Sequence, residues 1–489
     1  MEYTVFMLEE YISTSTLVVA LFYIATISAI ITVAFARRRE PATRFAWIVV
    51  LVFIPMVGIG LFLLFGRGYT RQERVKMSEE TACEVQDYLD RQMESARYMD
   101  FASPRYIQLA RMNISGAHSP LTADNSVEIF PAGEEKFRRL MEDIRNARCY
   151  IHMLYFIFRT DELGEELLDL LTQKAAEGLD VKLVYDDMGN IAVSRRGFKK
   201  LSEAGGRVFQ YSPLVTSWFS ANYRNHRKLV IIDDSIGYIG GMNVGAEYVK
   251  GRGKLTPWRD THARIEGSAV HVMESVFLPD YVYAAHKKEP LEDLSRCFDL
   301  SRDFSGSSTV QILASSPQGS HDSAHIHRSY LKMISAAQDY LYIQSPYLIP
   351  DSPVRDALGV AAASGVDVRI MIPLHPDKRL VYMASLSYAE ALCGLGVKIY
   401  LYDGFIHSKT VLVDDEVFSV GSANMDVRSF FLSFEANAVI YDRAVAAAQR
   451  QQFHADMEHS RLADAAYFAG LSPRVKFMMP LCQLFSPLL

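Results

Sequence analysis

The strongest constraint on the fold of this chain is a motif that occurs twice. The first copy lies in "YRNHRKLVIIDDSIGYIGGMN" and the second in "FIHSKTVLVDDEVFSVGSAN". In each copy a lysine follows a histidine by two residues, an aspartate follows the lysine by five, and a Gly-Gly-x-Asn or Gly-Ser-x-Asn segment comes next. One copy of so short a pattern is weak support for a function, but two copies with the same spacing require a common explanation.

The residues of the two motifs are expected to share one site. An alternating run such as "HSKTVLV" predicts a β-strand, and residues two apart on a strand point to the same face. A duplicated unit can bring equivalent segments together about a pseudo-two-fold axis, which would place both histidines in one pocket. The candidate catalytic residues are His226, Lys228, Asp233, His407, Lys409 and Asp414, with Asn243, Asn424, Asp260 and Glu435 as supporting residues.

The segments around the motifs repeat as well. "ARCYIHMLYFIF" corresponds to "AQDYLYIQSPYLIP", "EGLDVKLVYDD" to "SGVDVRIMIPL", and "RVFQY" to "KIYLY". Each half therefore predicts a strand, a helix and further strands, which is typical of an α/β sheet with helices on its faces. We expect two pseudo-symmetric α/β/α halves, residues 126–300 and 301–489, that share one active site.

The repeat also nominates partners for the histidines. "DTHARIEG" corresponds to "EANAVIYD", which suggests Asp260 behind His226 and Glu435 behind His407, each holding the second ring nitrogen. Solvent-exposed carboxylates at strand ends are the alternative. Asp233 and Asp414 come at the ends of strands, in "VIIDD" and "VLVDD", where a structural role in a turn and contact with the substrate both remain open.

Two apolar segments precede the repeat. Residues 16–36 and 45–65 carry no charge, and each is long enough as a helix to cross a hydrocarbon core of roughly 30 Å. The chain starts "MEYTVFMLEEY", without the basic start of a signal peptide. We expect a transmembrane helical hairpin within residues 1–67, followed by a mostly helical connector over residues 68–125.

With these features the chain resembles the phospholipase D superfamily, with its paired HxKxxxxD and GSxN or GGxN elements, and within it the bacterial cardiolipin synthases. The likeness covers almost the whole length, including "LFLLFGR", "YRNHRK", "PWRDTH" and the terminal "LFSPLL". One departure is Gly241, where the superfamily pattern often has serine. The resemblance implies phosphatidylglycerol as donor and acceptor, cardiolipin and glycerol as products, and a lipid bilayer as the surroundings.

The residue types suit transfer of a phosphodiester. Lys228, Lys409, Asn243 and Asn424 can donate to the phosphoryl oxygens and neutralise their charge. One neutral imidazole can attack phosphorus to form a phosphohistidine while the other, protonated, donates to the leaving group. The resemblance assigns His226 as nucleophile and His407 as acid and base, although near-symmetric halves leave the reverse open.

We expect no metal and no cofactor. A protonated lysine cannot ligate a metal, and the chain has no GxxxxGK[ST] nucleotide loop. A hydrolytic phospholipase D that uses water as acceptor would carry the same motifs. A membrane-tethered nuclease is disfavoured because the net charge is −6 and no basic, aromatic-interleaved stretch is present, so we expect no nucleic-acid partner. A non-catalytic scaffold is disfavoured because both His/Lys pairs are intact.

The membrane side is not set by the basic residues. Four lie in the turn between the apolar segments and four follow the second segment, so the positive-inside count is tied. The five cysteines are scattered without CxxC spacing, which favours a reducing compartment. We expect a multi-pass protein of the bacterial inner membrane whose catalytic part faces the cytoplasm.

Overall fold

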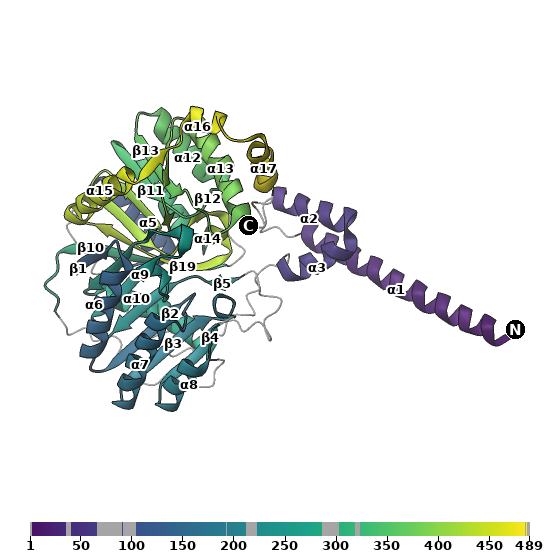
Figure 1. Cartoon of the computed structure of the whole chain (residues 1–489), viewed down its shortest axis with the longest axis horizontal. Coiled ribbons are helices and arrows are strands. Elements are labelled where there is room, and N and C mark those ends of the chain that lie inside the picture. The colour runs from purple at the N-terminus through teal and green to yellow at the C-terminus, as the bar shows by residue number, and fades with distance from the viewer. Residues whose placement is uncertain are drawn as a thin grey trace.

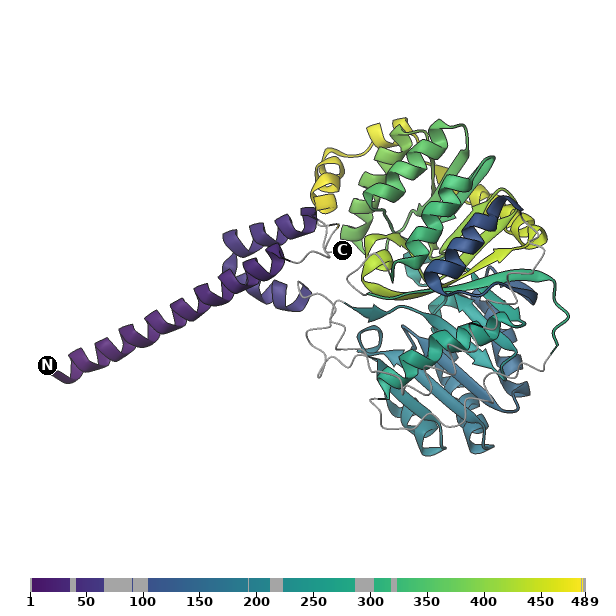
Figure 2. The same cartoon turned by 180° about the vertical axis from the view of Figure 1, so that it is seen from behind.

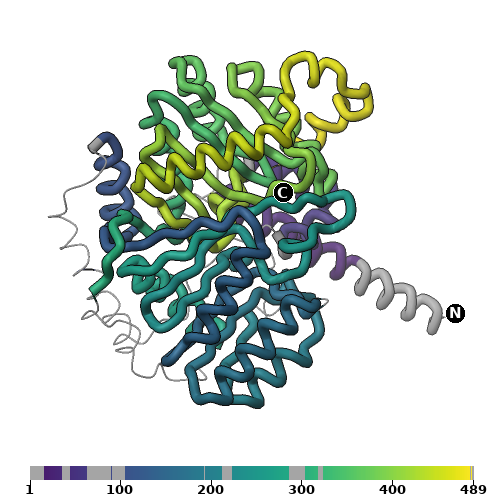
Figure 3. Tube along the Cα trace, turned by 60° about the vertical axis from the view of Figure 1, so that its left-hand side comes forward, coloured from purple at the N-terminus to yellow at the C-terminus, as the bar shows by residue number. Residues whose placement is uncertain are grey.

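The structure, a computed structural model, describes residues 2–35, 41–65, 90, 104–191, 193–211, 223–285, 303–317, 323–484 and 486. Two α/β units lie side by side, and a group of N-terminal helices projects from them (Figure 1). The two units remain distinct from other directions, blue and teal below green and yellow (Figures 2 and 3). The predicted α/β architecture of two similar halves is confirmed. The predicted connector, apart from residues 90 and 104–125, lies outside the described residues.

One sheet of 16 strands runs through both halves. The strands of the first half are β1 (Thr122–Phe130), β2 (Tyr150–Tyr155), β3 (Asp180–Asp186), β4 (Arg207–Tyr211), β6 (Lys228–Ile232), β7 (Ile236–Gly240) and β9 (His262–Glu266). Those of the second half are β10 (Ser308–Ser315), β11 (Tyr340–Gln344), β13 (Asp367–Pro373), β14 (Lys398–Tyr402), β16 (Thr410–Val413), β17 (Val417–Gly421), β19 (Ser433–Tyr441) and the edge strand β20 (Ser460–Leu462).

The strand order has the symmetry that the repeat predicts. From the first edge to the centre it is β4-β3-β2-β6-β7-β9-β1, and from the other edge, after β20, it is β14-β13-β11-β16-β17-β19-β10. Equivalent strands therefore occupy equivalent places, and β1 pairs with β10 at the middle. The pseudo-two-fold axis passes between these two strands.

Helices cover both faces of the sheet. On one face lie α6 (Gly133–Asn146), α7 (Glu162–Ala176) and α8 (Arg196–Glu203) in the first half, and α5 (Ile107–Ala117), α11 (His325–Ala336), α12 (Ser352–Ala363) and α13 (Arg379–Gly394) in the second. On the other face, α10 (Ala269–Ala284) and α15 (Arg443–Glu458) pack into a core formed by both halves. Because both faces are covered, strands such as β2 are buried along their whole length rather than alternating with solvent.

Two short strand pairs cross between the halves. β5 (Arg224–Asn225) pairs with β19 of the second half, and β15 (Phe405–Ile406) pairs with β8 (Trp258–Arg259) of the first. Each crossing strand comes directly before a motif histidine, so both histidines lie at the seam between the halves.

The second predicted transmembrane span does not form as one helix. The N-terminal helices are α1 (Glu2–Ala34), α2 (Pro41–Phe53) and α3 (Pro55–Phe65). At 13 and 11 residues, α2 and α3 measure about 20 and 16 Å, well short of a hydrocarbon core of roughly 30 Å. The chain breaks at Ile54 because the following proline lacks an N–H and disfavours helical backbone at the residue before it.

The apolar part of α1 is the one candidate span among the described residues. Residues Thr16–Ala34 form an uninterrupted apolar helix whose side chains are mostly exposed. α2 and α3 fold back on the end of α1, where Val33, Trp47, Leu51 and Phe62 form a small buried cluster. The predicted first span is thus one candidate helix, whereas the second apolar segment is a pair of short helices and is not a candidate span among the described residues.

Candidate active site

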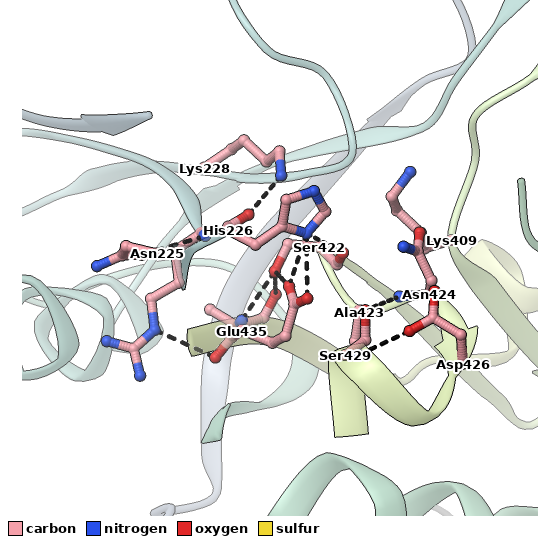
Figure 4. Close-up of polar contacts among 12 residues, drawn as sticks. Asn225, His226, Lys228, Lys409, Ser422, Ala423, Asn424, Asp426, Ser429 and Glu435 are labelled. Carbon is pink, nitrogen blue, oxygen red and sulfur yellow. Dashed lines mark hydrogen bonds and ion pairs between the residues drawn. The ribbon is translucent and has the colours of Figure 1, made fainter. Parts of the chain in front are cut away.

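His226 lies at the seam and contacts residues of the second half. Its Nδ1 atom is 3.1 Å from each carboxylate oxygen of Glu435 and 3.1 Å from the carbonyl oxygen of Ser422 (Figure 4). All three neighbours are acceptors, which assigns the proton to Nδ1 and leaves the lone pair on Nε2. The Phe156 ring packs edge-on against the imidazole at a centroid distance of 5.0 Å. His226 is thus an oriented, neutral base with a free nitrogen.

His407 has the corresponding contact with the first half. Its Nδ1 atom lies 2.6 Å from Oδ2 of Asp260. The other carboxylate oxygen of Asp260 accepts from the backbone N–H of Thr261 at 2.7 Å. Aromatic rings surround this imidazole, with Tyr248 and Trp258 each at a centroid distance of 5.9 Å. The two histidine–carboxylate pairs are therefore similar in design but different in their surroundings.

The predicted pairing of carboxylates with histidines is wrong. Asp260 serves His407 and Glu435 serves His226, so each carboxylate crosses to the histidine of the other half. The crossing strands explain this exchange. The backbone N–H of His226 donates to Phe434, next to Glu435, at 2.9 Å, and that of His407 donates to Arg259, next to Asp260, at 2.6 Å.

The lysines and asparagines of the motifs lie at the same site. The ammonium of Lys228 donates to the carbonyl of His226, and that of Lys409 to the carbonyl of His407. Both lysine side chains are buried. Figure 4 shows them with His226 and Glu435 in one view.

The two asparagines differ in how they are held. Asn243 accepts from the backbone N–H of Ile157 at 3.1 Å and donates to the Tyr248 hydroxyl at 2.7 Å. The side-chain oxygen of Asn424 is buried and has no hydrogen-bond partner within the described part of the chain. The open position at Asn424 is therefore an acceptor, whereas its amide N–H groups are the atoms that can donate to a phosphoryl oxygen.

Burial controls the protonation of the cationic groups. It lowers the pKa of His226 to about 4, against the opposing effect of Glu435. It also lowers the pKa of Lys228 to about 7 and of Lys409 to about 8, although Glu435 and Asp260 raise both. A bound phosphodiester anion would stabilise the charged lysines, because an opposite charge at close range raises a pKa.

The two carboxylates respond differently to burial. Burial raises the pKa of Asp260 to about 7. For Glu435, burial raises the pKa, but His226, Lys228 and the Ser422 hydroxyl together bring it below its usual value. Burial, with Lys409 and Lys228, lowers the pKa of His407. The raised pKa of Asp260 favours retention of a proton in the Asp260–His407 pair, while the lowered pKa values of Glu435 and His226 favour an ionised carboxylate behind a neutral imidazole.

The glycine that departs from the superfamily pattern has a steric reason. A Cβ atom at Gly241 would lie 2.1 Å from a carboxylate oxygen of Asp260. The equivalent Ser422 instead donates its hydroxyl to Glu435. This second role of Ser422 was missed, although the Gly/Ser difference between the two copies is visible in the sequence.

Asp233 and Asp414 do not reach the site, so their assignment as catalytic residues is wrong. They follow the far ends of β6 and β16. Asp233 accepts from the backbone N–H groups of residues 148–150 at 2.7 to 2.9 Å, and Asp414 accepts from those of residues 338–340 at 2.9 Å. Both have left-handed backbone, with φ of 50° and 53°. They fix the starts of β2 and β11, which is the structural role that the sequence left open.

Two curated proteins are similar to this chain over most of its length. A family model described as "Cardiolipin synthase, PLD-like domain" matches residues 140–253 and 330–457, and one described as "Phospholipase_D-nuclease N-terminal" matches residues 24–67. "Cardiolipin synthase 2" of Staphylococcus epidermidis is 41% identical over 97% of this chain and 98% of its own. "Major cardiolipin synthase ClsA" of Bacillus subtilis is 42% identical over 92% of this chain and 94% of its own.

A solved structure supports the fold at lower identity. The phosphatidylserine synthase of Haemophilus influenzae aligns with a TM-score of 0.59 and 17% identity, and the alignment covers 78% of this chain and 98% of that one. At this identity the similarity extends to the arrangement of the two halves.

Proposed function

Because the chain belongs to the cardiolipin synthases of the phospholipase D superfamily, we propose that it transfers the phosphatidyl group of one phosphatidylglycerol to a hydroxyl of a second, forming cardiolipin and glycerol. The observation that carries this proposal is the pair of crossed histidine–carboxylate contacts at one site with two buried lysines. Such a site can hold a phosphodiester anion, supply a nucleophile and move a proton.

In the first step His226 acts as the nucleophile. Its Nε2 lone pair attacks phosphorus, and the bond from phosphorus to the headgroup oxygen breaks. The ionised Glu435 stabilises the positive charge that develops on the ring. His407 gives the Nε2 proton to the departing glycerol oxygen, while the proton held with Asp260 moves to Nδ1. The products of this step are free glycerol and a phosphatidyl group on His226.

In the second step the roles of the nitrogen atoms reverse. His407 accepts the proton of the hydroxyl of a second phosphatidylglycerol, whose oxygen attacks phosphorus. The bond from phosphorus to Nε2 of His226 breaks, and cardiolipin forms. One phosphodiester is broken and one is made, so the exchange needs no nucleotide.

The lysines and asparagines bind the phosphoryl oxygens. Lys228 and Lys409 supply the positive charge, and Asn243 and Asn424 supply amide donors, in a site from which much of the water is excluded. Because both lysines have a lowered pKa before substrate binds, phosphate binding and lysine protonation reinforce each other.

The membrane arrangement follows from the N-terminal helices. We propose that α1 crosses the bilayer once, through Thr16–Ala34, and that α2 and α3 lie against its end without a second crossing. The C-terminal helix α17 (Pro473–Leu484) lies on the same side of the molecule as these helices (Figure 1). It exposes Phe477 and Leu484, which suits contact with the bilayer surface.

We place the catalytic halves on the cytoplasmic side, because the three cysteines among the described residues are free thiols. A membrane-impermeant thiol reagent applied to intact cells tests this placement at the exposed Cys149. Protection until the cells are opened supports it, and labelling of intact cells contradicts it.

Product analysis tests the reaction. The purified protein in detergent is incubated with phosphatidylglycerol alone, and lipids and glycerol are measured by mass spectrometry. We expect cardiolipin and free glycerol in equal amounts. Phosphatidic acid as the main product would show that water is the acceptor and would replace transfer by hydrolysis.

A further inference from the structure

The two halves differ where the loops after β2 and β11 reach the active site. Ile157 of the first half corresponds to Tyr347 of the second. The residues that follow them, Phe158 and Leu348, make the same type of parallel bridge to the residue after each motif asparagine. The two positions are therefore structurally equivalent, but one is apolar and the other carries a hydroxyl.

A second difference lies after the neighbouring strands. β3 pairs with β2 as β13 pairs with β11, which aligns Asp180 with Asp367. With this alignment continued past the strands, Asn190 of the first half corresponds to Asp377 of the second. The side chain of Asn190 bonds to the backbone of its own half, accepting from Phe158 at 2.8 Å. Asp377 is exposed and accepts from the Tyr347 hydroxyl at 2.6 Å. The second half thus presents a phenol–carboxylate pair. At the equivalent positions the first half has an apolar side chain and an amide that is hydrogen-bonded to its own backbone.

This pair lies beside the catalytic residues of the second half. The backbone of Tyr347 is fixed near Asn424, because Ser345 donates its hydroxyl to the Tyr347 carbonyl at 2.7 Å and accepts from the N–H of Met425 at 3.0 Å. The Asp377 carboxylate is also close enough to act on His407 and Lys409, raising the pKa of each against the lowering effect of burial.

The chemistry of the pair suits a polyol. A carboxylate accepts hydrogen bonds from hydroxyl groups, and a phenol that donates to it still accepts one. The Lys378 ammonium lies 5.3 Å from the centre of the Tyr347 ring and adds a donor on this side. Aromatic rings contact both imidazoles, Phe156 at His226 and Trp258 at His407, so they do not distinguish the two sides. The difference between the two sides is the Tyr347–Asp377 pair, which suits hydroxyl groups and has Ile157 and Asn190 in its place in the first half.

We propose that Tyr347 and Asp377 form a binding site for the diol of the glycerol headgroup, both when it leaves and when it attacks. This inference rests on the proposed function and adds where the leaving or attacking glycerol group binds. It sets the alcohol beside His407, the residue that exchanges a proton with it.

The reverse reaction tests this binding site separately from the catalytic residues, because the acceptor alcohol can be changed. Cardiolipin and free glycerol give two molecules of phosphatidylglycerol, whereas cardiolipin and 1-propanol give phosphatidylpropanol and phosphatidylglycerol through the same phosphohistidine. Glycerol has a diol for the pair to hold and 1-propanol has none. The KM for each alcohol is measured for the full-length protein in detergent and for Asp377→Asn, Tyr347→Phe and the control Asp403→Asn. Asp403 is an exposed carboxylate, paired with His375 at 3.1 Å.

We expect Asp377→Asn to raise the KM for glycerol about tenfold, the effect of losing a hydrogen bond to a charged group. Tyr347→Phe should raise it severalfold, and the reaction with 1-propanol should change less than twofold in either variant. Equal losses with both alcohols, or an Asp377→Asn variant that behaves like Asp403→Asn, would overturn the site. A wild-type protein that only hydrolyses cardiolipin would instead overturn the proposed function, and the site with it.

Discussion

The two halves of this protein share a fold but differ in the carboxylates that they supply to each other. The first half provides Asp260, next to Gly241, and the second provides Glu435, next to Ser422. The pKa of Asp260 is raised to about 7 by burial, whereas that of Glu435 is lowered by its cationic and hydroxyl neighbours. Duplication therefore gives the geometry of the site, and small differences around the two carboxylates give the two histidines different electrostatic surroundings.

Removal of either imidazole should have the largest effect. His226→Ala and His407→Ala should each lower cardiolipin formation at least about a thousandfold, because the first removes the nucleophile and the second the proton donor. Lipid mass spectrometry measures the rate, and circular dichroism checks that the variants are folded. Appreciable activity in either variant would contradict the mechanism in which both histidines act at one site.

Replacing the carboxylates should separate the two pairs. Glu435→Gln and Asp260→Asn should each reduce transfer from phosphatidylglycerol by about a hundredfold or more, since each disturbs the orientation and charge of its histidine. With a p-nitrophenyl phosphatidyl ester, whose leaving group needs no proton, Asp260→Asn should recover most of its first-step rate and Glu435→Gln should not. The two variants recovering equally would mean that the halves are functionally interchangeable.

The pH dependence of kcat/KM should report the protonation of His226 at low pH and the deprotonation of the two lysines at high pH. The rate constant kcat/KM should fall at low pH as His226, with a pKa of about 4, gains a proton and loses its nucleophilic lone pair. It should fall at high pH as Lys228 and Lys409, with pKa values of about 7 and 8, lose their charge.

The Glu435→Gln variant provides the control for the acid limb. Because Glu435 raises the pKa of His226, its replacement should move this limb to lower pH. A shift in the opposite direction would contradict the assignment of the limb to His226.

Exchange of the small residues beside the carboxylates should have unequal effects. Gly241→Ser should reduce activity tenfold or more and lower the unfolding temperature, since its Cβ would overlap Asp260 and force that carboxylate to move. Ser422→Gly removes one hydrogen bond to Glu435, worth about 1.5 to 3 kcal/mol for a charged acceptor, without a clash. Thermal unfolding and steady-state rates measure both, and a harmless Gly241→Ser would remove the steric explanation.

The motif aspartates should affect stability rather than turnover. Asp233→Asn and Asp414→Asn each weaken a set of bonds to backbone N–H groups. Asp414→Asn should cost more, because Asp414 also accepts from the Tyr106 hydroxyl at 2.8 Å. We expect losses of about 1 to 3 kcal/mol in the free energy of unfolding, with kcat per folded molecule within twofold. A selective loss of kcat would return these residues to the catalytic site.

The sequence predicted the fold and the meeting of the two motif histidines at the seam, because both depend on a repeat with fixed spacing. Paired segments such as "RVFQY" and "KIYLY" place equivalent strands in equivalent positions, and the strand order follows. The exchange of Asp260 and Glu435 was not predictable in this way. The repeat aligns Asp260 with Glu435, but it does not tell whether each carboxylate bonds to the histidine of its own half or to that of the other half. It depends on the crossing strands β5 and β15, which are two residues long.

Two other differences depend on Pro55 and on contacts between segments distant in the sequence. The length and hydropathy of residues 45–65 predict a span, but Pro55 ends the first helix, and α2 and α3 pack back against α1. The position of Asp233 after a strand fits either a turn or a ligand contact. Only the backbone N–H groups of residues 148–150, distant in sequence, decide between them.

The central claim, that His226 is the nucleophile and His407 the acid, is tested most directly by a burst experiment. His407→Ala and His226→Ala are each mixed with the p-nitrophenyl phosphatidyl ester, and released nitrophenol and the mass of the protein are followed. We predict that His407→Ala releases about one equivalent of nitrophenol and carries a phosphatidyl group on His226, while His226→Ala gives neither. A burst from His226→Ala, with the phosphatidyl group on His407, would contradict this assignment and reverse the roles of the two halves.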